Sequence, residues 1–138
     1  MRVVVDTNVL IAGALWSGPP HHIIELAETG KIVLCATAPM LDELRGVLKR
    51  RKFSGRLRTL RTTPDEILAS LLPLVELYPP ARASGAVPSD PDDEMFVGCA
   101  ISANADFISS GDDHLLRLKR ACAISIVSPA EFLRVLKK

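Results

Sequence analysis

Four acidic residues lie at positions where a carboxylate could bind a metal ion or take part in catalysis. Asp6 and Asp112 follow short apolar runs, whereas Glu43 and Asp93 stand early in segments with helical spacing. A hard divalent cation such as Mg²⁺ takes oxygen ligands, and a few carboxylates hold it together with waters and substrate phosphates. In phosphodiester hydrolysis such ions activate a water and neutralise charge, so no histidine base is required. The four acids would suit such a site if the fold brings them together.

The elements that must position these acids alternate between strands and helices. Short apolar runs predict five strands, at residues 2–5, 31–36, 75–78, 106–109 and 122–127. Helical spacing, prolines and cap residues predict helices at 9–15, 23–29, 39–48, 64–74, 91–103 and 112–119, and a last one from 129. Apolar strands separated by helices indicate a parallel sheet covered on both faces. The predicted fold is α/β, with three layers (α/β/α) around a central parallel sheet of about five strands.

This fold would gather the four acids at one edge of the sheet. Asp6 follows the first predicted strand and Asp112 follows the fourth, while Glu43 and Asp93 lie early in helices at the same rim. The functional crevice of an open α/β sheet lies beyond the carboxyl ends of its strands. The topology therefore predicts that the four carboxylates converge there.

Each acid also has a structural interpretation. Asp6 and Asp112 can cap the helices that follow them, and Asp93 can be the third-position acid of a capping box begun by Asp90. Glu43 lies beyond the first helical turn, where the benefit of the helix dipole has faded, so it could be a solvated surface acid. Spacing alone leaves both interpretations open.

An ordered set of motifs resembles those of PIN-domain nucleases, from residue 3 to about residue 116. The motifs are VVVDTNVL at 3–10, LDEL at 41–44, DPDDEMF at 90–96, CA at 99–100, ADFI at 105–108 and SGD at 110–112. The last four are similar to the DPDD, alanine-rich helix and TGD segments of the bacterial, VapC-like PIN subgroup that acts as toxin components. The DTN motif at 6–8 alone would be weak evidence, but the ordered set of motifs with these spacings is specific to the family.

The resemblance implies a PIN fold and a ribonuclease that uses Mg²⁺ or Mn²⁺. Its metal ligands would be Asp6, Glu43, Asp93 and Asp112, with Asn8 and Ser110 as polar support. The resemblance also implies a toxin whose site a neighbouring antitoxin blocks, and we expect a homodimer.

Two positions depart from the family pattern. Ser110 stands where the family usually has threonine, and this exchange keeps the hydroxyl. The acidic pair leaves a choice between Asp92 and Asp93 for one ligand. The spacing to the following strand favours Asp93.

A basic segment predicts the substrate class. Between Glu43 and Asp65 the chain has no acid but carries eight of its seventeen Lys and Arg residues. A basic rim beside an acidic metal pocket suits a polyanion such as single-stranded or structured RNA. A solvated helix end is the alternative interpretation. The RNA-binding candidates are Arg45, Lys49, Arg50, Arg51 and Lys52.

Composition sets the remaining bounds. The 138 residues are 48% hydrophobic and carry a formal net charge of +1, which predicts one globular domain over residues 1–138. Three widely spaced cysteines, Cys35, Cys99 and Cys122, lie in apolar runs and are expected to be buried, reduced thiols. No apolar run approaches the roughly 20 residues of a membrane span, so we expect a cytoplasmic protein without membrane contact.

Two other functions compete with the nuclease interpretation. A haloacid-dehalogenase-type phosphohydrolase would need a second aspartate two residues after Asp6, where this chain has Asn8. A non-catalytic PIN-like domain that binds RNA or a partner would typically lack one or more of the four acids, and all four are present. The sequence therefore favours a divalent-metal-dependent endoribonuclease.

Overall fold

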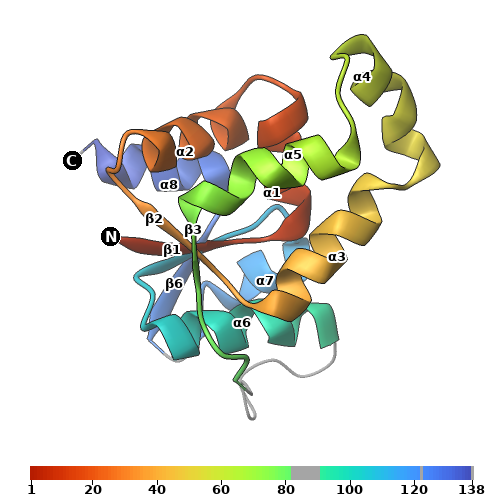
Figure 1. Ribbon diagram of the computed structural model, residues 1–138. Helices are drawn as coiled ribbons and strands as arrows, with labels where there is room; N and C mark the ends of the chain where they lie inside the picture. The colour runs from red at the N-terminus through yellow and green to blue at the C-terminus, as the bar shows by residue number, and fades with distance from the viewer. Residues whose placement is uncertain (82–90, 122, 138) are drawn as a thin grey trace.

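A computed structural model describes residues 1–81, 91–121 and 123–137, with the side chains of residues 91, 92 and 121 outside that description. Within these residues the chain forms a six-stranded sheet in the order β3-β2-β1-β4-β6-β5 (Figure 1). Five neighbouring strands run parallel and β5 runs antiparallel to β6. The strands are β1 (Arg2–Val5), β2 (Val33–Ala36), β3 (Val75–Leu77), β4 (Phe107–Ser109), β5 (Arg120–Ala121) and β6 (Ile124–Val127).

Helices cover both faces of this sheet (Figure 1). The α-helices are α1 (Thr7–Leu15), α2 (Pro19–Glu28), α3 (Ala38–Leu48), α4 (Ser54–Thr59), α5 (Pro64–Leu71), α6 (Pro91–Ala103), α7 (Asp113–Leu118) and α8 (Pro129–Leu136). Two 3₁₀ turns, η1 (Arg51–Phe53) and η2 (Leu72–Leu74), follow α3 and α5. The three-layer α/β fold with five parallel strands is confirmed.

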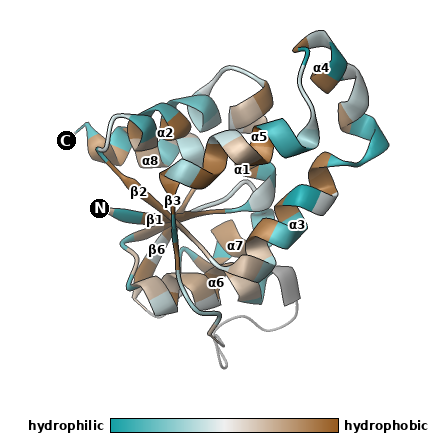
Figure 2. Ribbon diagram, viewed as in Figure 1, coloured by the Kyte–Doolittle hydropathy of each residue, from teal (hydrophilic) through white to brown (hydrophobic). Residues whose placement is uncertain are grey.

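The apolar strands are buried on both faces because the sheet separates two hydrophobic clusters. Side chains alternate along a strand, so Val3 and Val5 pack into one cluster and Val4 into the other. The first cluster contains residues of α1, α2, α3 and α8, with Phe132 fully buried. The second contains residues of α6 and α7. This double burial explains the near-continuous apolar strands at the centre of Figure 2.

Several helices are capped at their first turn by a side-chain hydrogen bond. Thr63 accepts a hydrogen bond from Glu66 N at the start of α5, and Ser128 and Glu131 form a capping box at the start of α8. These caps follow from the sequence signals at both sites. The predicted cap at Asp90 lies outside the described residues.

The prediction for the fifth strand was only partly right. A strand was expected over 122–127, but β6 begins at Ile124, and the two-residue β5 precedes it on the sheet edge. Ala123 has a positive φ of 68°, which interrupts the extended backbone there. Residue 122 and most of the predicted proline- and alanine-rich connection at 79–88 lie outside the described residues.

The short helical segments that follow α3 were not predicted from the sequence. Residues after α3 form η1 and then α4, which extend the α3–α5 side of the molecule away from the sheet (Figure 1). Phe53 and Leu57 are the buried residues that attach this segment to the first cluster. Their spacing of four residues is too short a pattern to specify a helix from sequence.

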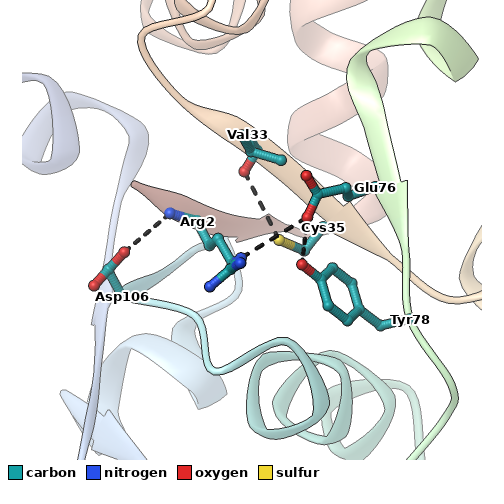
Figure 3. A network of polar contacts seen from close by, with 6 residues as sticks. All are labelled: Arg2, Val33, Cys35, Glu76, Tyr78 and Asp106. Atoms are coloured by element: carbon teal, nitrogen blue, oxygen red, sulfur yellow. Dashed lines mark hydrogen bonds and ion pairs between the residues drawn. The ribbon is translucent and has the colours of Figure 1, made fainter.

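Polar contacts join the amino-terminal end of β1 to its neighbours (Figure 3). Arg2 N donates to Asp106 at 2.9 Å, the Arg2 side chain lies 3.8 Å from Glu76, and the Tyr78 hydroxyl donates to Glu76. The Arg2 and Glu76 side chains are about half exposed, so their pair contributes little stability. We interpret this network as structural.

Two of the three cysteines are described, and both are free thiols in the core. Burial raises the pKa of Cys35 to about 11 and the pKa of Cys99 to about 12. Both thiols are therefore protonated and poorly reactive near neutral pH. The prediction of buried, reduced thiols is confirmed for these two, and Cys122 lies outside the described residues.

Candidate active site

The four predicted acids line one cavity at the carboxyl end of the sheet. Its volume is about 260 Å³, and its lining residues are Asp6, Thr7, Asn8, Glu43, Val47, Arg50, Asp93, Phe96 and Asp112. These residues come from the turn after β1, from α1, α3 and α6, and from the segment between β4 and α7. Segments that are far apart in the sequence thus contribute one carboxylate each. The convergence expected from the topology is observed.

Asp6 accepts hydrogen bonds from three different donors. Its Oδ1 accepts a hydrogen bond from Val9 N at 2.8 Å, which caps α1, and its Oδ2 accepts from Gly111 N at 3.2 Å and from the Ser110 hydroxyl. The residue is only 5% exposed. A carboxylate offers about four acceptor positions, so three donors leave roughly one for a further partner. Capping and a second role in the cavity are therefore compatible.

Ser110 connects two of the acidic segments. It is fully buried, its hydroxyl donates to Asp6, and its Oγ accepts from Asp112 N at 2.9 Å. The hydroxyl is therefore both donor and acceptor, and it holds the turn after β4 against the end of β1. Ser110 thus contacts Asp6 directly, although it is not among the residues that line the cavity.

Glu43 is held at the cavity by a contact that the sequence did not reveal. Thr7 Oγ1 donates to Glu43 Oε2 at 3.2 Å, and both residues line the cavity. Glu43 is the sixth residue of α3. It lies past the first turn, so the helix dipole does not explain its position. The contact joins the first residue of α1 to α3 at the cavity.

Asp93 in α6 and Asp112, just before α7, complete the set. Asp93 is the third residue of α6 and is 4% exposed. Asp112 is partly exposed and caps α7, because its Oδ1 accepts from His114 N at 3.0 Å. The structure thus places the Asp93 side chain on the cavity, whereas the side chain of Asp92 lies outside the described residues.

The electrostatics of Asp6 follow from its burial. Loss of hydration is the main cause that raises the pKa of the Asp6 carboxyl above its ordinary value, and the nearby Asp112 charge adds a smaller rise. The hydrogen bonds from Ser110, Val9 and Gly111 oppose the shift, because they stabilise the charged form. A cation in the cavity would favour the ionised carboxylate for the same reason.

The donor chemistry of the cavity fits a hydrated divalent cation. Among the described residues no three His, Cys, Asp or Glu side chains are close enough together to form a complete metal-binding group. Mg²⁺, however, is usually bound through one or two carboxylates and keeps several waters. Four carboxylates around a polar cavity of about 260 Å³ leave room for such waters.

The basic residues around this cavity are not equivalent. Arg50 lines the acidic cavity and is the one basic residue among its described lining residues. Arg45 Nε instead lies 3.3 Å from Asp65, and the Lys52 ammonium lies over the Phe53 ring at 5.1 Å. The sequence predicted a basic rim but could not tell Arg50 from its neighbours.

A larger hollow, of about 650 Å³, lies away from this site between α2 and α8. None of the four predicted acids lines it.

In the part of the chain that is described, no helix is long and apolar enough to span a membrane.

Fold and site together define the class of the protein. The family model described as "PIN domain" matches residues 2–114, and the chain belongs to the PIN domain family. PIN domains are in general nucleases. No curated protein sequence matches the chain.

One solved structure supports the fold. The chain is similar to one in the crystal structure of VapBC2 from Rickettsia felis bound to a DNA fragment from their promoter, with a TM-score of 0.60 and 16% identity. That match covers 91% of this chain and 97% of the other. The PIN domain of human SMG5 also matches, with a TM-score of 0.49, 13% identity and 99% of each chain covered.

Proposed function

We propose that this PIN domain is a divalent-metal-dependent endoribonuclease that cleaves single-stranded RNA. The observation that carries the proposal is the convergence of four carboxylates, from segments far apart in the sequence, on one polar cavity. Membership of the PIN family supports nuclease chemistry. Arg50 on the same cavity supports an anionic substrate.

The residues that would hold Mg²⁺ or Mn²⁺ are Asp6, Glu43, Asp93 and Asp112, some directly and the others through waters of the hydrated ion. When bound, such an ion activates a water and neutralises charge on the phosphate oxygens. The protein supplies position: Ser110 and Gly111 fix Asp6, and Thr7 orients Glu43. In the reaction a water oxygen bonds to phosphorus, one P–O ester bond breaks, and the leaving oxygen receives a proton.

The biological setting we propose is that of a toxin component in a toxin–antitoxin pair, acting in the cytoplasm. The match to the VapBC2 structure supports the fold of such a protein. We further propose that a cognate antitoxin covers the acidic cavity and that the protein forms a homodimer. Co-purification with the product of a neighbouring short gene tests the first point, and light scattering tests the second.

Cleavage of a fluorescent single-stranded RNA with Mg²⁺ or Mn²⁺, compared with chelator, tests the activity. Asp93→Asn should reduce cleavage at least 100-fold, because it removes a charged oxygen ligand from the cavity. Asp42→Asn is the matched control, since Asp42 is an exposed acid beside Glu43 on α3 and should retain wild-type activity. Equal cleavage by both variants, or cleavage that survives chelator, would refute the proposal.

A further inference from the structure

A second hollow lies beside the acidic cavity on the basic side of the molecule. Its volume is about 320 Å³, and it is formed by the end of α3, by α4 and by the start of α5. Buried Leu48 and Leu57 form part of its wall, and Arg50 lines both this hollow and the acidic cavity. The two hollows are therefore adjacent and share one arginine.

The polar residues of this second hollow favour an anion. Lys49, Arg50 and Arg58 bring three positive charges to its lining, together with the hydroxyls of Thr62 and Thr63. The Ser54 hydroxyl also lines the hollow, but it donates to Arg51 O at 2.7 Å. No acid is among its described lining residues. Thr63 Oγ1 accepts from Glu66 N, so its hydroxyl hydrogen is available to donate to a ligand.

Other cations of the same segment are engaged within the protein. Arg56 Nε donates to Leu15 O at 2.7 Å and its guanidinium lies over Trp16, and Arg45 pairs with Asp65 at 3.3 Å. The side chains of Lys49, Arg50 and Arg58, by contrast, make no hydrogen bond or ion pair with the described residues. The cations that line the hollow are thus those left to bind an external anion.

We infer that this second hollow is a subsite for a non-scissile phosphate of the RNA strand whose scissile phosphate lies in the acidic cavity. The inference rests on the proposed ribonuclease function. A polymer with regularly repeated phosphates can occupy two adjacent hollows at once, whereas a single free anion cannot. Arg50 contacts the strand between them, so it is a positioning residue that sets the path of the RNA.

Neutral backbone substitution provides a direct test. A methylphosphonate replaces one phosphate at a time at each non-scissile position of a single-stranded substrate, and kcat/KM is measured for wild type, Arg58→Gln and Arg61→Gln. Arg61 is the matched control, because it is an exposed arginine of the same basic segment that lines neither hollow. Thermal melts check that all three proteins fold equally well.

If the subsite exists, the effect of Arg58→Gln on kcat/KM should not add to the effect of neutralising one particular phosphate of the RNA. Losing a charge-assisted contact to an exposed arginine should lower kcat/KM about 3- to 10-fold, mainly through KM. In wild type and Arg61→Gln one methylphosphonate position should show this loss, and in Arg58→Gln that position should show no further loss. The slope of log KM against log salt should also fall by about 0.7 in Arg58→Gln.

The outcomes separate this inference from the proposed function. If wild type does not cleave the unmodified RNA, the ribonuclease function is wrong. If wild type cleaves it but Arg58→Gln has the same KM and no position is coupled to Arg58, the subsite is wrong. If RNA cleavage is unaffected and Arg58→Gln instead weakens capture of an acidic protein segment, the hollow is a protein-binding site and the inference is overturned.

Discussion

Ser110→Ala should disturb the site and the stability of the protein at the same time. The substitution removes the hydroxyl that donates to Asp6 and accepts from Asp112 N at 2.9 Å. Ser110 is fully buried and Asp6 is 5% exposed, so water replaces these contacts poorly. The change therefore leaves a buried carboxylate with one donor fewer and a backbone N–H without its acceptor.

The magnitude follows from these two lost contacts. A hydrogen bond to a charged group contributes about 1.5–3 kcal/mol, and a buried group left unsatisfied costs about 1–3 kcal/mol. Allowing for local rearrangement, we expect a loss of about 2 kcal/mol in the free energy of unfolding. For a domain of this size that corresponds to a fall in Tm of roughly 5–10 °C.

The pKa of Asp6 gives the effect a definite pH dependence. Burial raises this pKa, and the Ser110 hydrogen bond is the largest of the effects that lower it. Without the hydroxyl the pKa of the folded state should rise further. A raised folded pKa means that the folded state binds more protons than the unfolded state, so stability falls as pH rises from the unfolded pKa through the folded pKa. The deficit of Ser110→Ala should therefore be larger at pH 7 than at pH 4.

Thermal melts across pH 4 to 8, together with the pH profile of RNA cleavage, measure both effects. The acid limb of the cleavage profile should move to higher pH in Ser110→Ala, because Asp6 would keep its proton to higher pH and a cation binds only the ionised carboxylate. Ser70→Ala is the matched control, since Ser70 is exposed on α5 and its hydroxyl donates to Ile67 O at 2.7 Å, within its own helix. If Ser110→Ala melts within 1 °C of Ser70→Ala, with an unshifted acid limb, the hydroxyl does not position Asp6.

Two further predictions concern stability. Asp93→Asn should raise the free energy of unfolding of the metal-free protein by about 1 kcal/mol at pH 7, because it removes one of several charges from a partly desolvated cavity. Mn²⁺ should then stabilise the variant less than wild type in thermal melts. If the metal-free variant is instead less stable than wild type, Asp93 is a structural residue. Gly13→Ala should destabilise the protein by about 2 kcal/mol in denaturant unfolding, since the new methyl would lie 2.6 Å from Pro20 O and 2.8 Å from Ile24 Cδ1 between α1 and α2; Gly46→Ala, where nothing lies within 4 Å, is its control.

Local sequence patterns predicted the parts of the fold that depend on neighbouring residues. The apolar run at Arg2–Val5 specified a strand buried on both faces, and Ser128 with Glu131 specified the start of α8. Such signals are reliable because a cap or a strand is decided by interactions within a few residues. The order of strands and helices then indicated that Asp6 and Asp112 lie at the same rim. The single-domain organisation of residues 1–138 stays a prediction.

Patterns of this kind could not predict elements that depend on packing. The segment after α3 forms η1 and α4 because Phe53 and Leu57 find places in the first hydrophobic cluster. The edge strand β5 forms because Arg120 pairs with Ser125 and Ala121 with Ile124 across a reversal of the chain. Neither element has a periodic pattern long enough to be predicted from the sequence.

For the site, the sequence by itself determined which residue types were available: four acids, a hydroxyl after β4 and a basic segment after α3. Only the tertiary structure decided how they are used. Ser110 and Asp6 are 104 residues apart and Thr7 and Glu43 are 36 apart, so their hydrogen bonds exist only once the sheet has aligned β1 with β4 and α3 has packed beside α1. Likewise, Arg50 differs from Arg45 because folding directs Arg50 toward the acidic cavity and leaves Arg45 beside Asp65. Local propensity depends on residues near in the chain, whereas these contacts depend on which surfaces the hydrophobic core brings together.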